Sequence, residues 1–180
     1  MLLQEHQIKS EIRRKMLSIR DNLNISIVND CSNKLYEIIT KEDYYINHQI
    51  IGIYYPIRNE LNPRVLERDQ NKTFLYPKII GDEIKFFEAK DDFEENKYKI
   101  MEPKNSVESI PEIILVPCLA LDDELNRIGY GKGFYDKYLS KHKKVISIGI
   151  IYSFQLVTNI KVFSSFDVKL DKRIIIDYDK

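Results

Sequence analysis

Three glycines at alternate positions, set between two cations, are the residues of this chain best suited to chemistry. The run is Arg127-Ile128-Gly129-Tyr130-Gly131-Lys132-Gly133-Phe134-Tyr135-Asp136. Glycine has no Cβ, so such a run lets the backbone approach a ligand and direct several amide donors at one anion. Arg127 and Lys132 add positive charge, and Asp136 is a suitable ligand for an accompanying Mg²⁺. The run therefore predicts a nucleotide and metal site, with a glycine-rich turn carrying incidental charges as the alternative.

Two common phosphate-binding loops are excluded by the spacing of these glycines. A Walker loop has four residues between its glycines and then Gly-Lys-Ser/Thr, an order that residues 129–136 do not follow. A dinucleotide fingerprint has two residues between its second and third glycine and opens a strand-turn-helix unit early in the chain. The sequence therefore predicts neither a Walker loop nor a Rossmann cofactor site.

Length and composition favour one domain spanning residues 1–180. Lys and Arg number 28, as do Asp and Glu, so no overall charge attracts nucleic acid or an anionic membrane. Cys31 and Cys118 match no metal-ligand spacing, and so few thiols are typical of a reducing compartment. Residues 1–14 mix charged and apolar side chains and lack the apolar core of a signal peptide. We expect a cytoplasmic protein. A monomer is the expected state, and an oligomer is not excluded by the sequence.

The N-terminal segment, residues 3–23, has the periodicity of an amphipathic helix. Lys9, Arg13 and Arg20 lie on a stripe beside its apolar residues. This basic edge is either a solvated face or part of an anion site. A second helix is expected from an N-cap at Ser26 to about Lys41. The apolar residues of the first helix are Ile8, Ile12, Met16, Ile19 and Leu23.

The rest of the chain alternates strand and helix patterns, which predicts an α/β domain. The wholly apolar residues 113–116 suit a central strand covered on both faces, with the glycine run beyond its carboxyl end. We expect a single domain with a mainly parallel or mixed central sheet flanked by helices, in a Rossmann-like three-layer arrangement. The other expected elements are strands at 49–55, 73–76, 84–87, 145–152 and 173–176, a turn within 77–83, an exposed loop at 90–99 and a helix at 134–141.

Several of these residues together resemble the 5-formyltetrahydrofolate cyclo-ligase family, also called 5,10-methenyltetrahydrofolate synthetases. The family signature is a strand ending in Val-Pro, an apolar-Asp segment, and Arg-Leu-Gly-x-Gly-x-Gly-Tyr-Tyr-Asp. It corresponds here to Val116-Pro117, residues 119–122 and residues 127–136. Shorter elements agree in the same order, and the resemblance covers nearly the whole chain. They are Lys9-x-x-x-Arg13, Glu60, Ile100-Met101-Glu102-Pro103, and the acidic residues Asp167 and Asp171.

The chain departs from the family pattern at four places. Cys118 and Leu125 stand where the family usually has glycine, the latter just before Asn-Arg. After Glu60 the family commonly continues with Asp-Thr, whereas this chain has Asn62-Pro63. Phe166 replaces a residue that is often polar. These departures bear on the shape of the loop and on binding strength more than on the type of reaction.

The resemblance implies an enzyme that converts 5-formyltetrahydrofolate and ATP to 5,10-methenyltetrahydrofolate, ADP and phosphate. It implies that ATP is bound by Lys9, Arg13 and all residues from 127 to 135, that is Arg127, Ile128, Gly129, Tyr130, Gly131, Lys132, Gly133, Phe134 and Tyr135. Tyr55, Glu60 and residues 130–134 are implied to bind folate, and Asp136 and Asp167 to hold Mg²⁺.

Phosphoryl transfer needs positioning and charge neutralisation more than a protein nucleophile. We therefore assign the catalytic roles to Arg127 and Lys132, which would stabilise the transferring group, and to Tyr135, which would position the formyl oxygen or stack on folate. Two alternatives stay open at this point. A small-molecule kinase would release a phosphorylated product, and a non-catalytic folate- or nucleotide-binding module would release none.

Overall fold

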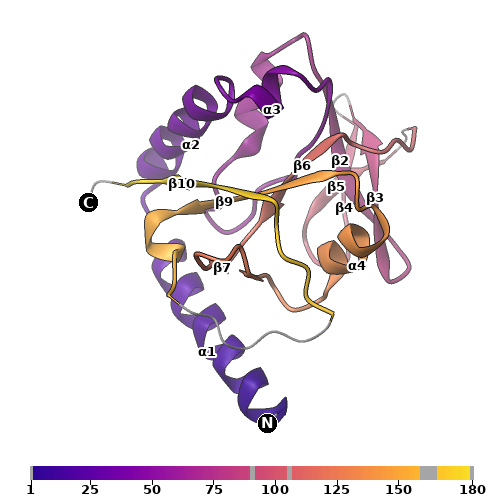
Figure 1. Ribbon diagram of the computed structural model, residues 1–180. Coiled ribbons are helices and arrows are strands. Elements are labelled where there is room, and N and C mark those ends of the chain that lie inside the picture. Colours follow the sequence, from indigo (N-terminus) through magenta and orange to yellow (C-terminus); the bar gives the residue numbers. More distant parts are fainter. Residues whose placement is uncertain (1, 90–91, 105–106, 159–165, 179–180) are drawn as a thin grey trace.

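A mixed six-stranded sheet forms the centre of the molecule in our computed structural model, which describes residues 2–89, 92–104, 107–158 and 166–178 (Figure 1). The strand order is β10-β9-β6-β1-β2-β3. All neighbours are parallel except β2 and β3, which pair antiparallel. The strands are β1 Ile50–Gly52, β2 Thr73–Ile80, β3 Glu83–Glu88, β6 Ile113–Pro117, β9 Ile146–Tyr152 and β10 Lys172–Ile176.

Helices cover both faces of this sheet and give three layers, as predicted. In Figure 1, α2 lies over one face and α4 over the other, while α1 extends away beneath the sheet. Two separate buried clusters confirm this arrangement, since α2 contributes to one and α4 to the other. The helices are α1 Leu2–Asp21, α2 Ile25–Ile39, α3 Asp43–Ile46 and α4 Phe134–Lys141, with 3₁₀ turns at Pro63–Arg68 and Ser153–Gln155.

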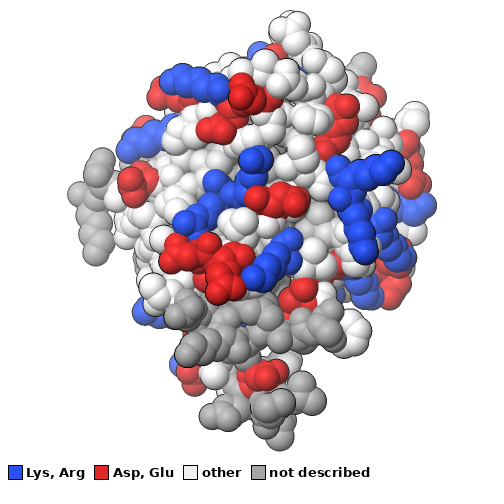
Figure 2. Space-filling model, in the orientation of Figure 1, with Lys and Arg blue, Asp and Glu red and all other residues white. Residues whose placement is uncertain are grey.

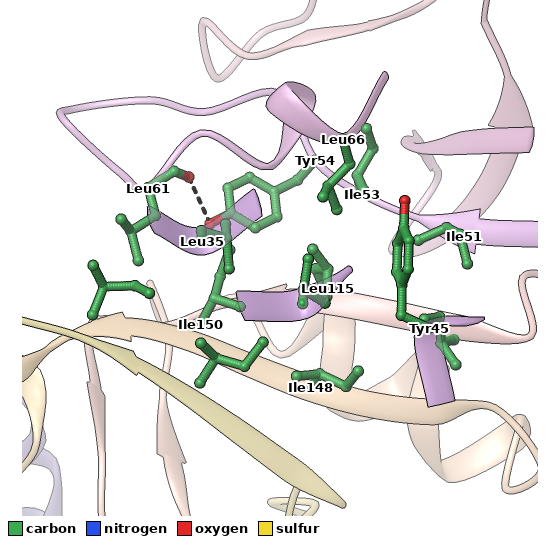
Figure 3. Packing of buried hydrophobic residues seen from close by; sticks show 14 of the residues in the cluster. Leu35, Tyr45, Ile51, Ile53, Tyr54, Leu61, Leu66, Leu115, Ile148 and Ile150 are labelled. Atoms are coloured by element: carbon green, nitrogen blue, oxygen red, sulfur yellow. Dashed lines mark hydrogen bonds between the residues drawn. The ribbon is translucent and has the colours of Figure 1, made fainter. Parts of the chain in front are cut away.

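The packing of strand β6 on both of its faces explains why residues 113–116 are all apolar. Its alternate residues Ile113 and Leu115 pack in the cluster under α2, and Ile114 and Val116 pack in the cluster under α4. Successive side chains of a strand point to opposite faces, so a strand covered on both sides has no solvent-facing position. Figure 3 shows Leu115 packed among residues of β1 and β9 in the first cluster.

The order of the strands creates a reversal point between β1 and β6. Strand β2 pairs with one edge of β1, and β6, which comes later in the chain, pairs with the other edge of β1. The two strands pair directly, with Ile51 opposite Ile113 and Gly52 opposite Ile114. In open α/β sheets, ligands bind beyond the carboxyl ends of strands at such a point. The segments that follow β1 and β6 are therefore the place to look for a site.

Most predicted elements are confirmed, with boundaries that differ at identifiable residues. The second helix begins one residue before Ser26, because the Asn24 side chain is the cap and accepts a hydrogen bond of 2.9 Å from the Ser26 amide. Strand β2 continues to Ile80, so the turn is confined to Gly81, with a φ of 66°, and Asp82. The strand expected at 49–55 ends at Gly52.

Two small hairpins were not predicted. The stretch expected to be an exposed loop, residues 90–99, contains β4 (Phe93–Glu95), which pairs with β5 (Met101–Pro103). Residues 90 and 91 lie outside the described residues. A second hairpin joins β7 (Ala120–Leu121) to β8 (Arg127–Ile128). This hairpin lies between β6 and α4 in the chain, and the three glycines follow directly after β8.

The surface agrees with the balanced composition. Both basic and acidic side chains are spread over the face seen in Figure 2, and the basic group at its right has acidic side chains beside it. Within the described parts of the chain, no helix has the length and apolar character needed to span a membrane. Cys31 and Cys118 are both buried, Cys31 in the cluster under α2 and Cys118 in the cluster under α4.

Candidate active site around the glycine loop

The glycine loop, residues 129–133, joins β8 to α4 at the reversal point of the sheet. The hairpin that leads into it pairs Ala120 with Ile128 and Leu121 with Arg127. At the tip, the Asp122 carboxylate accepts hydrogen bonds of 2.9 Å from the Asn126 amide and side chain. The tip residue Leu125 has a φ of 66°, in the left-handed region that favours glycine. A glycine, which the resemblance described above implies at this position, would adopt this conformation without strain.

Each glycine of the loop has its own structural reason. A Cβ on Gly129 would lie 2.6 Å from Nη1 of Arg127, so this glycine makes room for a side chain of the protein. Gly131 and Gly133 have φ values of 92° and 69°, and Gly133 is the N-cap of α4. At Gly131 and Gly133 the backbone therefore has a conformation that would be strained in residues with a side chain. Gly129 instead leaves room for the side chain of Arg127.

Arg127 lies beneath the loop rather than on its open side. The residue is 8% exposed, and its Nη2 donates to Oδ2 of Asp136 at 2.8 Å while Nη1 donates to the Pro117 carbonyl at 3.3 Å. The guanidinium also lies 5.6 Å from the centre of the Tyr135 ring. Its Nε is buried without a hydrogen-bond partner among the described residues. The structure thus links Arg127 to the packing of the loop, although the sequence suggested a free cation.

Two cations of α1 meet the loop and the segment after it. Arg13 donates from Nε to the Gly129 carbonyl at 2.8 Å, and Lys9 pairs with Asp167 at 2.6 Å. Burial lowers the pKa of Arg13, and the negative charge of Asp167 partly opposes this. The basic edge of the first helix is therefore part of the site and not a freely solvated face. Lys132 is different, because it is exposed, with Nζ 5.6 Å from the centre of the Tyr98 ring.

The two aspartates expected to hold Mg²⁺ both have protein partners. Asp136 accepts from Arg127 through Oδ2 and from the Val168 amide through Oδ1 at 3.2 Å. Asp167 pairs with Lys9. Within the described ranges, no three acidic, histidine or cysteine side chains form a group that could hold a metal ion. A metal ion would have to displace a cation from either carboxylate, and the Lys9–Asp167 pair is the more exposed of the two, with side chains 17% and 23% exposed against 6% and 17% for Arg127 and Asp136.

Glu60 reaches the glycine loop from the other side of the reversal point. It follows β1 after a bend in which Arg58 and Asn59 have φ values of 50° and 57°. Oε1 of Glu60 accepts from the Tyr130 hydroxyl at 2.9 Å, and Oε2 accepts from the Ile57 amide at 3.0 Å. Burial raises the pKa of this carboxyl, against the opposing effect of the nearby arginine Arg20. The loop and the segment after β1 therefore form one site.

Arg20 is a buried residue of the candidate site to which the sequence analysis assigned no role. It is 1% exposed, and its Nη1 lies 3.6 Å from Oε1 of Glu60. Its Nη2 donates to the Tyr130 hydroxyl, and its Nε donates to the Arg58 carbonyl at 2.8 Å. The signal was present in the sequence, because Arg20 lies seven residues, two helical turns, after Arg13 on the same basic stripe.

The predicted aromatic residues differ in where they lie. The Tyr55 ring packs against Phe93, 5.5 Å between centres, and under the Arg64 guanidinium at 4.8 Å. No described contact joins it to Glu60 or to the glycine loop. The preceding residue, Tyr54, is buried, and its hydroxyl donates to the Leu61 carbonyl, the dashed line of Figure 3. The structure thus does not bring Tyr55 together with the other predicted site residues.

The two aromatic residues that follow the loop, Phe134 and Tyr135, have different surroundings. The pKa of Tyr135 is raised, first by burial and then by Glu60, so its phenol stays protonated over the usual pH range. Phe134 contacts Tyr98 edge to face at 6.2 Å between ring centres. Tyr98 therefore has Phe134 and Lys132 as neighbours, and it belongs to the rim of the loop, although nothing in the local sequence identified it.

Comparisons with known proteins agree with the fold and identify relatives of this chain. The sequence model of the 5-formyltetrahydrofolate cyclo-ligase family matches residues 5–176. The 5-formyltetrahydrofolate cyclo-ligase of Haemophilus influenzae is 26% identical over 86% of this chain and 90% of that protein. A probable 5-formyltetrahydrofolate cyclo-ligase of Schizosaccharomyces pombe is 31% identical over 57% of this chain and 60% of that protein.

Two solved structures of related proteins have the same overall fold as this chain. The 5,10-methenyltetrahydrofolate synthetase of Aquifex aeolicus superposes with a TM-score of 0.80 at 27% identity, over 94% of this chain and 89% of that one. The synthetase of Mycoplasma pneumoniae gives 0.70 at 27% identity, over 92% and 97%. With the glycine loop, the basic edge of α1 and Glu60 at one reversal point of such a sheet, this chain belongs to the 5-formyltetrahydrofolate cyclo-ligase family.

Proposed function

We propose that this protein uses ATP to convert 5-formyltetrahydrofolate to 5,10-methenyltetrahydrofolate, with release of ADP and phosphate. The observation that carries the proposal is the meeting of two kinds of site at one reversal point. Lys9, Arg13 and the glycine loop supply cations and backbone amides for phosphate. Glu60, on the other side of Tyr130, supplies a carboxylate for a ring with N–H donors.

The chemistry explains why phosphate and folate groups must be adjacent. A formamide carbon is a poor electrophile, because its nitrogen donates into the carbonyl and its oxygen is a poor leaving group. Attack of the formyl oxygen on the γ-phosphorus breaks the bond to the β-phosphate oxygen and releases ADP. N10 then attacks the formyl carbon, loses its proton, and phosphate leaves with the former formyl oxygen.

The residues of this chain would contribute by binding, orientation and charge. Lys132, exposed at the loop, can turn toward the transferring group, and Arg13 and Lys9 can bind the other phosphates. Glu60 would accept hydrogen bonds from the amino and ring N–H groups of the pterin. Arg127 would act by holding the loop, since Asp136 and Pro117 already bind it. Tyr135 would orient the formyl oxygen as a neutral donor.

A Mg²⁺ ion would enter with ATP. Mg²⁺ is commonly bound by one or two carboxylates together with substrate phosphates, and it neutralises their charge. Asp167 would be its protein ligand, released from Lys9 when that lysine turns to a phosphate. The proposal does not require Asp136 as a ligand, and it does not require Tyr55 at the pterin. A monomeric cytoplasmic enzyme is the accompanying expectation.

The first experiment mixes purified protein with 5-formyltetrahydrofolate, Mg²⁺ and ATP, and follows the long-wavelength absorbance of the methenyl product. Free phosphate is measured in parallel, with controls that lack ATP or contain a non-hydrolysable ATP analogue. We expect absorbance that grows only with ATP, and one phosphate for each methenyl group.

The same experiment separates the alternatives. A stable phosphorylated product without free phosphate would establish a small-molecule kinase. Binding of ATP or folate by folded protein, with no turnover of either, would establish a binding module. In both cases the proposed cyclisation would be wrong.

A further inference from the structure

Each nitrogen of the Arg20 guanidinium lies close to a polar group of the protein on the candidate folate side of the site. Nε donates to the Arg58 carbonyl, Nη2 donates to the Tyr130 hydroxyl, and Nη1 lies 3.6 Å from Oε1 of Glu60. The cation is 1% exposed and Glu60 is 5% exposed. An unpaired charge with so little solvent is strongly unfavourable, so the pair is expected to act as a unit.

Tyr130 completes this unit from the glycine loop. Its hydroxyl accepts from Arg20 and donates to Oε1 of Glu60, while the residue as a whole is 37% exposed. The guanidinium of Arg20 also lies 5.7 Å from the centre of that ring. Glu60 is fixed at its other oxygen by the Ile57 amide. A carboxylate oxygen has about two acceptor positions, so Oε2 can still receive a donor from a ligand.

We propose that Arg20 is a positioning residue for the folate substrate, which holds the Glu60 carboxylate and the Tyr130 ring in the arrangement that the pterin meets. This inference rests on the proposed function, which gives Glu60 its contact with folate. Arg20 itself is too deeply buried to touch the substrate. Its effect on the reaction must therefore pass through Glu60 and Tyr130.

The charges around Glu60 make the role of Arg20 measurable by pH. Burial raises the pKa of Glu60, and Arg20 is the largest influence that lowers it, ahead of the Ile57 amide, Tyr130 and Arg58. Without Arg20 the carboxyl would be protonated at a higher pH, and a protonated carboxyl is a weaker acceptor for the pterin donors. The other titratable groups that interact with Glu60 are Tyr54, Cys118, Tyr135 and Tyr152.

The test compares Arg20→Met with Arg20→Lys, Tyr130→Phe and the wild-type enzyme. We expect Arg20→Met to raise the KM for 5-formyltetrahydrofolate roughly tenfold or more, because a hydrogen-bonded charge is removed, while the KM for ATP changes less than about twofold. The acidic limb of kcat/KM for folate should move to higher pH. Arg20→Lys should restore part of the folate KM, and Tyr130→Phe should raise it less than Arg20→Met.

Arg14→Met is the matched control, because Arg14 is an exposed arginine of the same helix outside the site. It should leave both KM values unchanged. Thermal unfolding of every variant shows whether lost activity is lost folding. If Arg20→Met does not fold, the lysine and phenylalanine variants carry the test. An unchanged folate KM and pH profile in folded variants would overturn the inference, as would equal losses for ATP and folate.

Failure of the proposed function would be recognised separately. In that case the wild-type enzyme would itself form no methenyl product. Calorimetric binding of 5-formyltetrahydrofolate to the wild-type protein and the Arg20 variants would then decide the inference alone. Weaker binding by Arg20→Met, partly restored in Arg20→Lys, would support the positioning role, and equal binding by all three would refute it.

Discussion

The proposed folate side and the proposed phosphate side of the site differ in the burial and pairing of their charged side chains. On the folate side, Arg20, Glu60 and Tyr130 satisfy one another in a buried network before any ligand arrives. On the phosphate side, Lys132 is exposed and Lys9 is part-buried in an ion pair. A buried charge needs fixed partners, whereas an exposed cation keeps its water until a phosphate replaces it. One side is thus prepared for a ring, and the other is left open for a highly charged ligand.

Arg127 is the residue that tests this division most severely. It belongs to the phosphate loop in sequence, but its burial and its pairing with Asp136 resemble the folate side. We expect Arg127→Met to lower the free energy of unfolding by about 3 kcal/mol, because breaking a buried pair leaves an unpaired charge. Urea unfolding of the variant and the wild type measures this change.

The matched control for that variant is Lys85→Met. Lys85 pairs with Glu108 at 2.8 Å in an exposed position, so its removal should change the free energy of unfolding by less than about 1 kcal/mol. If Arg127→Met keeps its stability and loses only turnover, then Arg127 reaches the phosphates and the division between the two sides fails.

Lys132 should show the opposite behaviour. We expect Lys132→Ala to slow turnover about 100-fold, because a cation that stabilises the transferring group contributes mainly in the transition state. The free energy of unfolding should stay within about 0.5 kcal/mol, since the side chain is exposed. Steady-state kinetics and urea unfolding on the same preparation measure both quantities.

Lys137→Ala is the control for Lys132, because Lys137 is also exposed, lies in the next helix, and pairs with Asp82 at 2.6 Å, away from the loop. Its turnover should be that of the wild type. Near-normal turnover of folded Lys132→Ala would remove this lysine from the chemistry and leave Arg13 and Lys9 as the phosphate cations.

Leu125 offers a smaller test, which changes the support of the loop without touching a cation. Its φ of 66° is strained for leucine, and its side chain is half-buried. Leu125→Gly and Leu125→Ala both remove that side chain, but only glycine also relieves the backbone. We expect the glycine variant to be more stable than the alanine variant by about 1 kcal/mol. Equal stability in urea unfolding would show that the turn is not strained.

The sequence identified those parts of the site whose cause is local. The periodicity of α1 and the apolar run of β6 follow from residues close together, and so does the unusual backbone of Gly131 and Gly133. A short motif could not show that Arg127 turns under its own loop, because this depends on Asp136 and on the space left by Gly129.

The partners that escaped prediction lie far apart in the chain. Arg20 meets Tyr130 at a separation of 110 residues, and only the folded sheet brings the two together. The role of Tyr55 stays a prediction. The family resemblance implied that it lines the pterin side, and the structure places its ring against Phe93 and Arg64 after β1 has ended.

The contacts of α1 also have a consequence for synthesis on the ribosome. This helix is made before its partners Gly129 and Asp167, which follow its contact residues 116 and 158 positions later. Closing such long loops is slow relative to local structure, so α1 must wait while the sheet forms. Lys9 and Arg13 reach their positions beside the glycine loop only after residue 167 has emerged. A chain whose synthesis stops before residue 167 therefore has much of its sheet but an incomplete candidate site.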